Sequence, residues 1–349
     1  MLVPDSLYIE RDGVMEIGNG IELIQTSFGN KRPLNLVLFN GDEKVLVDTG
    51  LMGTPSEGIL PEMDRIGVSP KDLSMVLVTH AHADHFGGNE EILEASGGKV
   101  KFGAHEIDIP FIEDPVKFTL KGNQPFVDLG VMSEDDLKEG IREVGNGIKV
   151  EVPLKGGEVF DFGKGLEVEV HFLPGHTPGN IALLEKSTST FVIGETICGT
   201  SQYNTDGEVV SICNYDDIDL YLETITKFGK IDFDLVVFSH INMIRRKEMI
   251  AFLAESAKFV YNFDLEVKKR IEEAGKKITS VEIWKKLDGL WDKYGADTGM
   301  YYLLEVHLKS LLKRGAIEGS IADGFLFTGE EQGDLKKRCE EVIAGLPEC

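Results

Sequence analysis

The sequence is poor in cysteine. Only four cysteines occur in 349 residues, and they are Cys198, Cys213, Cys339 and Cys349. None of them has the CxxC spacing, and they form no dense framework. This scarcity argues against a fold held by disulfides, so we expect a reduced, cytoplasmic setting.

Long apolar runs are also missing. No stretch approaches the roughly 18–20 uninterrupted apolar residues that a membrane-spanning helix needs. The N-terminal residues MLVPDSLYIERDGVME contain no basic segment followed by an apolar run, so no secretory signal is predicted. We therefore expect no membrane association.

Basic residues are scarce relative to acidic ones, with 36 Lys and Arg against 60 Asp and Glu and a net charge of −24. Residues 1–250 hold 42 acidic and 21 basic residues, and residues 251–349 hold 18 and 15. A surface this acidic repels phosphate backbones, and the short run Arg245-Arg246-Lys247 does little to offset it. We expect a solvated acidic surface and no nucleic-acid partner.

The length and the apolar content favour two domains with buried cores, because 349 residues with 42% hydrophobic side chains exceed one average domain. The first part is rich in predicted strands. Residues 34–39 and 44–48 flank an Asn40-Gly41 turn, which is typical of a β-hairpin. Further strands are predicted at residues 74–79, 166–172, 181–184, 190–193 and 234–238, and helices at 58–66 and 90–95. This mixture predicts a layered αβ/βα fold of the α/β class.

Residues 105–157 mix Pro, Gly and acidic residues with short apolar pieces. Two interpretations stay open for them: an insertion that covers the active site, or surface loops.

The pattern changes near residue 246, so we place the domains at 1–245 and 246–349. Apolar residues then recur at three-, four- and seven-residue steps, which predicts a long helix: Met249, Leu253, Val260, Phe263, Val267 and Ile271. Helices at 281–291, 299–314 and 334–344, with a hairpin formed by 315–318 and 324–327, resemble a winged helix. Its near-neutral charge indicates packing on the first domain or a dimer interface rather than DNA or RNA binding. The aromatic residues Trp284, Trp291, Tyr301 and Tyr302 are accordingly expected in a core or an interface.

A histidine-rich motif follows the apolar strand at 74–79. His80 and His82 are one residue apart, so both can point the same way, and Asp84 and His85 follow directly. Imidazole nitrogens and a carboxylate oxygen are the ligands expected of a hydrolytic zinc site. The HxHxDH spacing at the end of a strand is a strong signal.

Three further residues stand at similar places. His176 lies in the tight turn Pro174-Gly175-His176-Thr177-Pro178, Glu195 ends the strand at 190–193, and His240 follows the strand at 234–238. Each signal is weak by itself, because a single histidine at a strand end is more often structural. Their combination in one chain indicates a common site.

Taken with Asp48-Thr49-Gly50, these motifs resemble the metallo-β-lactamase superfamily over residues 20–245, most closely its glyoxalase II-like and lactonase-like branch. The resemblance implies a four-layered αβ/βα sandwich, here with a mostly helical C-terminal subdomain. It implies that His80, His82 and His176 hold one metal ion, that Asp84, His85 and His240 hold a second, and that Glu195 bridges them. Asp48 would orient ligand imidazoles.

Glu195 departs from the pattern, since the bridging residue of the family is usually Asp. The extra methylene lengthens the side chain by about one carbon–carbon bond. Glutamate ligands occur in the alkylsulfatase-like members, whose HxHxDHFGG run also resembles residues 80–88 here. Those members lack the Pro-Gly-His turn, so the sequence resembles each of the two branches only in part.

Two divalent cations are therefore the expected cofactors, with Zn²⁺ first and iron or manganese as alternatives. Such a pair can share a water and lower its pKa towards neutrality, and the bridging hydroxide then attacks the substrate. Asp84 would be both ligand and catalytic residue, so no Ser or Cys nucleophile and no organic cofactor is required. We expect a hydrolase of a small ester-like substrate, a thioester or a lactone.

Other functions stay open at this point. They are a nuclease or phosphodiesterase acting on RNA or nucleotides, a sulfate-ester hydrolase, an iron enzyme that oxidises persulfides, and a site that has lost catalysis. We interpret His105, His171 and His307 as structural and give Cys198 no role in the site. The predicted partner is a small molecule, and a homodimer is left open.

Overall fold

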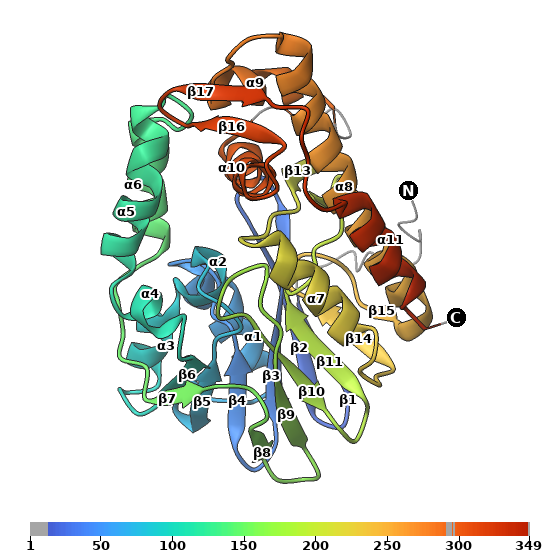
Figure 1. Ribbon diagram of the computed structural model, residues 1–349. Helices are drawn as coiled ribbons and strands as arrows, with labels where there is room; N and C mark the ends of the chain where they lie inside the picture. The colour runs from blue at the N-terminus through green and yellow to red at the C-terminus, as the bar shows by residue number, and fades with distance from the viewer. Residues whose placement is uncertain (1–12, 291–294, 296, 348–349) are drawn as a thin grey trace.

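The computed structural model describes residues 13–290, 295 and 297–347. Two mixed β-sheets pack face to face with helices on both outer faces, so the predicted four-layered α/β sandwich is confirmed (Figure 1). Trp291, Cys349 and residues 1–12, which the sequence-based predictions include, lie outside the described residues.

The first sheet has seven strands in sequence order. They are β1 (Gly13–Gly18), β2 (Ile21–Phe28), β3 (Arg32–Asn40), β4 (Lys44–Val47), β5 (Leu73–Leu77), β6 (Lys101–His105) and β7 (Val152–Leu154). Strands β1 to β4 are antiparallel, and β4 to β7 are parallel. The predicted hairpin at Asn40-Gly41 is confirmed, since Asn40 pairs with Lys44.

The second sheet has six strands and follows a different order. They run β15 (Ile244–Arg245), β14 (Leu235–Phe238), β11 (Thr190–Gly194), β10 (Ile181–Glu185), β9 (Glu167–Phe172) and β8 (Val159–Asp161). A separate hairpin, β12 (Ser201–Tyr203) with β13 (Val209–Ile212), was not predicted. This hairpin contributes a residue to the candidate site.

The described helices cover both sheets and make up most of the C-terminal region. Before residue 246 they are η1 (Pro55–Ile59), α1 (Leu60–Arg65), η2 (Pro70–Asp72), α2 (Ala83–Phe86), α3 (Asn89–Ala95), α4 (Ile109–Glu113), α5 (Pro115–Asp128), α6 (Glu134–Glu143) and α7 (Ile218–Phe228). After it come α8 (Arg246–Ala274), α9 (Ser280–Leu287), α10 (Thr298–Lys313) and α11 (Leu335–Ala344). None of them combines the length and the apolar character that crossing a bilayer requires.

The inner core lies between the two sheets and is built by the alternation of side chains along each strand. Val37 and Phe39 of β3 point into this core, whereas Leu36 and Leu38 point to the helices outside. All four side chains are buried because β3 is covered on both faces. A site open to substrate therefore has to lie at the ends of the strands.

The C-terminal region begins with one long helix, α8. The six apolar residues of its predicted stripe are all buried, which confirms this helix. The hairpin of β16 (Ile317–Ser320) and β17 (Gly324–Phe327) also forms, with Ile317 paired to Phe327. One buried cluster joins β10, β11 and α7 to helices α8 to α11. We keep the domain boundary at 245/246 as a proposal, based on the start of α8.

Residues 105–157 contain the helices α4, α5 and α6, so the surface-loop interpretation is wrong. Helix α5 reaches the C-terminal region. The Phe126 ring lies 5.5 Å from that of Tyr301 and 6.4 Å from that of Tyr302, and Thr298 donates a hydrogen bond to the carbonyl of Val131. Short-range periodicity missed these helices because Pro and Gly interrupt it and distant aromatic contacts stabilise the segment.

Candidate metal centre

The predicted ligands come from loops and a short helix at the ends of four strands. His80 and His82 follow β5, and α2 carries Asp84 and His85. His176 follows β9, Glu195 follows β11 and His240 follows β14. The structure brings all of them together in two groups. The first group is His80, His82, His176 and Glu195, and the second group is Asp84, His85, Glu195 and His240.

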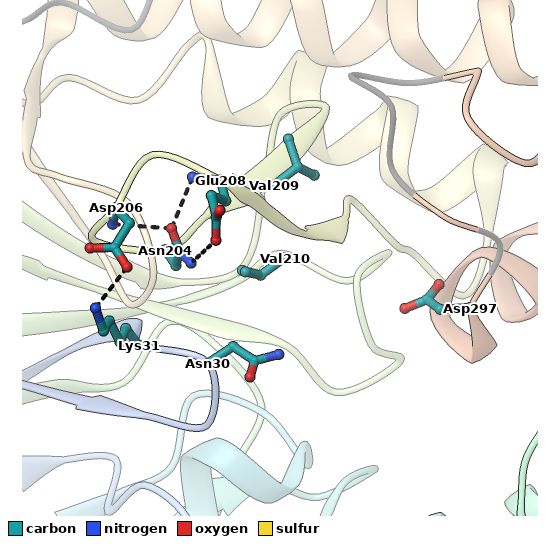
Figure 2. Close-up of a pocket in the computed structure, with 8 residues that line it drawn as sticks. All are labelled: Asn30, Lys31, Asn204, Asp206, Glu208, Val209, Val210 and Asp297. Atoms are coloured by element: carbon teal, nitrogen blue, oxygen red, sulfur yellow. Dashed lines mark hydrogen bonds and ion pairs between the residues drawn. The ribbon is translucent and has the colours of Figure 1, made fainter.

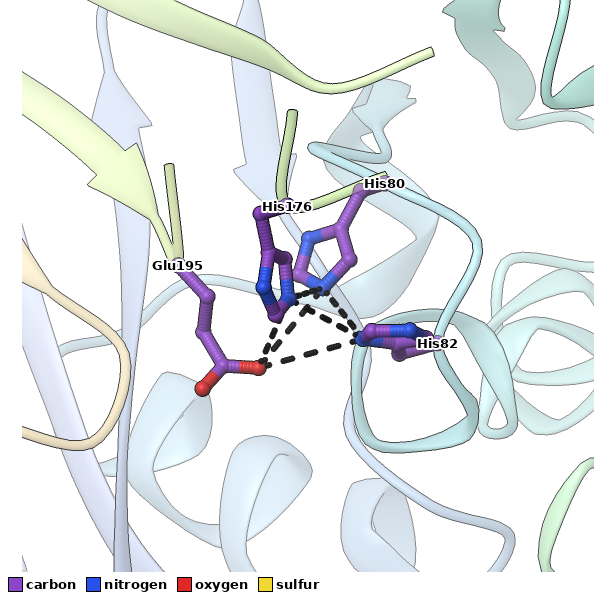
Figure 3. A group of neighbouring side chains, drawn as sticks. All are labelled: His80, His82, His176 and Glu195. Carbon is purple, nitrogen blue, oxygen red and sulfur yellow. Dashed lines mark hydrogen bonds and ion pairs between the residues drawn. The ribbon is translucent and has the colours of Figure 1, made fainter. Parts of the chain in front are cut away.

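The ring nitrogens of the first group form a tight triangle (Figure 3). His80 Nε2 lies 3.1 Å from His82 Nδ1, and His176 Nε2 lies 3.2 Å from the former and 3.1 Å from the latter. A tetrahedral zinc ion with Zn–N bonds of about 2.0–2.1 Å would separate its ligands by roughly 3.3 Å. The spacing of the three nitrogens therefore suits one tetrahedral cation.

The second group is looser and contains a second carboxylate. His240 Nε2 lies 3.1 Å from Asp84 Oδ2, and His85 Nε2 lies 3.9 Å from Asp84 Oδ1. The described residues offer no hydrogen-bond partner to the buried Nε2 atoms of His85 and His240. A buried polar atom without a hydrogen-bond partner is costly, so these two nitrogens are suited to hold a cation.

Glu195 belongs to both groups through one oxygen. Its Oε2 lies 3.3 Å from His176 Nε2 of the first group and 3.6 Å from His85 Nε2 of the second. The other oxygen, Oε1, accepts a hydrogen bond from Gln202 of the β12–β13 hairpin. Gln202 thus orients the longer side chain so that a single oxygen faces both groups. The sequence held no signal for it, because Gln202 belongs to no ligand motif.

Gly194 lets Glu195 reach this position. Its φ is +56°, and a Cβ atom there would lie 2.7 Å from Thr79 Oγ1. A larger residue would be strained and would push the end of β11 away from the loop that carries His80.

Three of the histidines are oriented through the ring nitrogen that faces away from the site. His85 Nδ1 donates to Asp48 Oδ2 at 2.8 Å. The backbone carbonyls of Asn214 and Pro33 accept from His176 Nδ1 at 2.9 Å and from His240 Nδ1 at 2.8 Å. A carbonyl can only accept, so Nδ1 carries a proton and Nε2 is the nitrogen that faces the site.

Asp48 lies where the sequence placed it, directly behind the histidines. It accepts hydrogen bonds from the backbone N–H and the hydroxyl of Thr79 at 2.7 and 2.8 Å, in addition to His85 Nδ1. Its φ of 62° is uncommon for a residue with a side chain. Three hydrogen bonds to one buried carboxylate offset this local strain.

The charges of the site favour cation binding. Burial alone would raise the pKa of Asp84 and of Glu195, but the surrounding histidines outweigh it and lower both values. Both groups are therefore carboxylates at neutral pH. Burial likewise opposes the charged forms of His85 and His176, yet the neighbouring Asp48 and Glu195 carboxylates raise their pKa values. Burial lowers the pKa of His80.

Asp108 is a further buried residue that the motifs did not reveal. It precedes α4, and its Oδ2 accepts from the N–H of Ala81 at 2.9 Å and from Thr177 Oγ1 at 3.3 Å. It therefore ties the loop between His80 and His82 to the turn that holds His176. Burial raises the pKa of Asp108 to about 6.

The remaining histidines lie outside both groups. The His105 ring stacks on Phe172, His171 packs against Phe191, and His307 is hydrogen-bonded in the C-terminal region. Cys198 is closer to the site, with its Sγ 3.9 Å from His176 Nδ1 and 2.6 Å from Cys213 Sγ.

A polar cavity of about 530 Å³ adjoins the turn of the β12–β13 hairpin (Figure 2). Its lining residues are Asn30, Lys31, Asn204, Asp206, Glu208, Val209, Val210 and Asp297, and no predicted ligand is among them. Lys31 and Asp206 form an ion pair at 2.7 Å across it. The same hairpin carries Gln202, so the cavity and the ligand groups share a structural element.

The metallo-beta-lactamase superfamily model matches residues 31–240. The chain is 42% identical over 60 residues to a UPF0173 metal-dependent hydrolase of Pyrococcus horikoshii, covering 17% of this chain and 24% of that protein. It is 29% identical over 168 residues to the anti-Pycsar protein Apyc1 of Paenibacillus, covering 47% and 58%. The chain thus spans about a quarter of the first relative and somewhat more than half of the second.

Two solved structures resemble most of the fold. A metallo-beta-lactamase family protein of Thermus thermophilus has a TM-score of 0.69 at 18% identity, covering 90% of this chain and 100% of that one. A beta-lactamase domain protein of Burkholderia ambifaria has a TM-score of 0.69 at 19% identity, covering 93% and 96%. Residues 1–245 could not supply such coverage, so the shared fold extends into the C-terminal helices.

Proposed function

The chain belongs to the metallo-beta-lactamase superfamily, and from this premise we propose that it is a hydrolase that depends on two divalent cations. One observation carries the proposal: seven residues from four strand ends form two ligand groups that share Glu195 Oε2. His80, His82 and His176 would hold one cation, and Asp84, His85 and His240 would hold the other. Zn²⁺ is the proposed metal, because three imidazole nitrogens dominate the first group and their spacing suits it, while the second group combines imidazoles with carboxylates that zinc also accepts.

When bound, such a cation pair supplies a water of lowered pKa and a polarised oxygen on the scissile group. The residues of the chain do the rest. Asp84 is a carboxylate with its Oδ2 against His240, so it can accept a hydrogen bond from the attacking water and orient it. Asp48, Gln202 and the carbonyls behind the histidines maintain the ligand directions.

We propose a small ester-like substrate, a thioester or a lactone, in keeping with the resemblance to the glyoxalase II-like and lactonase-like branch. The net charge of −24 supports a small molecule over a nucleic acid, because a long polyanion would be repelled. The described cysteines Cys198, Cys213 and Cys339 are free thiols, which supports a cytoplasmic location.

The decisive experiment combines metal analysis with a substrate panel. The purified protein is assayed for zinc, iron and manganese, and for hydrolysis of thioesters, lactones, sulfate esters and phosphodiesters. We expect two equivalents of metal and hydrolysis of at least one thioester or lactone. Asp84→Asn should keep the fold and lower kcat at least ~100-fold, because a neutral amide accepts the hydrogen bond of the water less strongly than a carboxylate does.

Three outcomes would contradict the proposal. A protein with two equivalents of metal that cleaves only phosphodiesters would favour the nuclease alternative, and one that cleaves only sulfate esters would favour the sulfatase alternative. A protein that binds no divalent cation would remove the hydrolase function altogether.

A further inference from the structure

Residues 213–217, which connect β13 to α7, lie directly behind a predicted metal ligand. The carbonyl of Asn214 accepts the hydrogen bond from His176 Nδ1 at 2.9 Å. The N–H of Asp216 donates to the carbonyl of Gly175 at 2.8 Å, next to His176. We call residues 213–217 the bridging segment. Its position decides where Nε2 of His176 points.

The opposite side of the bridging segment is held by the C-terminal region. The Tyr215 hydroxyl lies 2.7 Å from His307 Nε2, and the Tyr302 hydroxyl donates to Asp216 Oδ1 at 2.6 Å. His307 and Tyr302 both belong to α10. Two successive residues of the segment are therefore bonded to one helix that is distant in the sequence.

The donor and the acceptor of each hydrogen bond between Tyr215, His307 and Asp264 can be assigned. His307 Nδ1 lies 3.1 Å from Asp264 Oδ1, and Arg314 Nη2 donates to the same oxygen at 2.6 Å. A carboxylate can only accept, so His307 carries its proton on Nδ1 and its Nε2 accepts from Tyr215. Burial lowers the pKa of His307, which keeps the ring neutral and this direction unchanged.

The branch of the connection through Tyr215, His307 and Asp264 is buried, whereas Asp216 and Tyr302 are partly exposed. Tyr215 and His307 are 0% exposed and Asp264 is 4% exposed. The Tyr215 ring also stacks on Tyr221 of α7, with centroids 4.6 Å apart. Because the groups are shielded from water and hydrogen-bonded in series, Tyr215 has a single well-defined position.

We propose that Tyr215, His307 and Tyr302 are positioning residues for His176, through which the C-terminal region sets the geometry of the first ligand group. This inference rests on the proposed function, because it assigns a role only if His176 binds a cation. It gives helix α10 a part in the metal site although none of its residues is a ligand. Residues that orient a ligand in this way typically change metal affinity 10–100-fold when they are altered.

The test uses variants that each remove one hydroxyl. Tyr215→Phe and Tyr302→Phe break the two bonds to the bridging segment. Tyr301→Phe is the matched control, because Tyr301 is also buried on α10 but its hydroxyl bonds to Ser280 at 2.7 Å instead. The metal-free proteins are titrated with Co²⁺, and binding to the two groups is followed by calorimetry and visible absorption. Circular dichroism and thermal unfolding monitor the fold.

We expect Tyr215→Phe and Tyr302→Phe to weaken one of the two binding events 10–100-fold and to alter its Co²⁺ spectrum. The other event, and both events in Tyr301→Phe, should stay within twofold of wild type. His307→Leu should behave as Tyr215→Phe does. His307→Gln should restore binding, because an amide can donate to Asp264 and accept from Tyr215.

The outcomes separate the two proposals. Wild-type protein that binds no Co²⁺ overturns the proposed function and, with it, this inference. If wild type binds two equivalents but Tyr215→Phe and Tyr302→Phe bind them equally well, only the positioning role is overturned. Equal losses in all variants, including Tyr301→Phe, would also overturn it, since they would reflect the fold rather than His176.

Discussion

The two ligand groups differ in which part of the molecule orients them. His85 and His240 of the second group are held by Asp48, which follows β4, and by the carbonyl of Pro33 in β3. Both partners belong to the seven-stranded side of the sandwich. His176 of the first group is held by Asn214, in a segment bonded to α10. The histidines of the second group are thus oriented by the seven-stranded sheet, whereas His176 of the first is also oriented through the C-terminal region.

Two neighbouring ligand groups can therefore differ in how much their orientation relies on distant parts of the chain. The first group has nitrogens 3.1–3.2 Å apart but relies on helices from the end of the chain. The second group is less compact, but the residues that orient its histidines belong to the seven-stranded sheet itself. We expect substitutions in these supports to weaken one group more than the other, and substitution of Glu195 to weaken both strongly.

The largest effect is expected from Glu195→Gln. The amide removes the shared negative charge, so both metal-binding events should weaken by roughly 100-fold or more, as expected for loss of a ligand rather than of an orienting residue. Calorimetric titration of the metal-free protein with Zn²⁺ measures this. Gln202→Ala is the matched control, since it removes only the hydrogen bond to Oε1 and should have a smaller effect. Weakening of one event alone would show that Glu195 is not shared.

Asp48→Asn should mainly affect the second group. Asparagine tolerates the φ of 62° at this position, so the backbone should not change. The neutral amide holds His85 less firmly, and we expect a 10–100-fold loss of affinity in one binding event. A smaller loss in the other is expected, because Thr79 connects Asp48 to His80 Nδ1 at 3.0 Å. Equal losses of metal affinity in both groups would show that Asp48 does not support the second group in particular.

Metal binding should depend on pH in both groups. The neighbouring carboxylates raise the pKa values of His85 and His176, so the metal-free protein carries protons on these rings near neutral pH. A cation has to displace these protons, and its apparent affinity should therefore fall as pH falls, by up to ~10-fold per unit for each proton released. Calorimetry in two buffers of different protonation enthalpy measures how many protons are released when the cation binds. Binding heats that are independent of the buffer would contradict this.

The smallest effect on metal binding is expected from Asp264→Asn, which acts on the support of the first group. Burial would raise the pKa of Asp264, but the hydrogen bond from His307 and the charge of Arg314 outweigh it and lower it. Its carboxylate thus stabilises the fold above its unfolded pKa of about 3.9, and this stability is lost as pH falls through the lowered value.

Removing one partner of this buried pair should lower the free energy of unfolding by about 3 kcal/mol at pH 7. Urea denaturation measures it. Glu331→Gln is the control, because Glu331 also pairs with Arg314 but is more exposed, and its loss should cost less than about 1 kcal/mol. The difference in stability between wild type and Asp264→Asn should shrink as pH falls below about 3.9, and a difference that does not change with pH would contradict the assignment of the charge.

Much of the fold was predictable because it depends on short-range patterns. The Asn40-Gly41 hairpin, the strand before His80 and the apolar stripe of α8 follow from turn chemistry and periodicity within about twenty residues. Helices α4 to α6 and the β12–β13 hairpin were missed. Pro and Gly interrupt the pattern of α5, whose Phe126 contacts Tyr301 of α10, and the hairpin is held to the site by Gln202.

The ligands were predictable for the same reason, whereas their supports were not. His80, His82, Asp84 and His85 occur within six residues, and His176, Glu195 and His240 each follow a strand. Gln202, Asp108 and Asn214 act through one or two hydrogen bonds each, and Asn214 acts through its backbone carbonyl, which any residue could supply. No residue type marks such a position in advance.

The amino-acid sequence by itself determined the layered α/β class and the residue types that can hold cations, because both depend on local spacing and side-chain chemistry. Only the tertiary structure decided that one oxygen of Glu195 faces both groups, and that a helix near the end of the chain supports His176 from behind. Those features depend on distances between segments more than ninety residues apart, and such distances are set when the sheets, the bridging segment and α10 pack together.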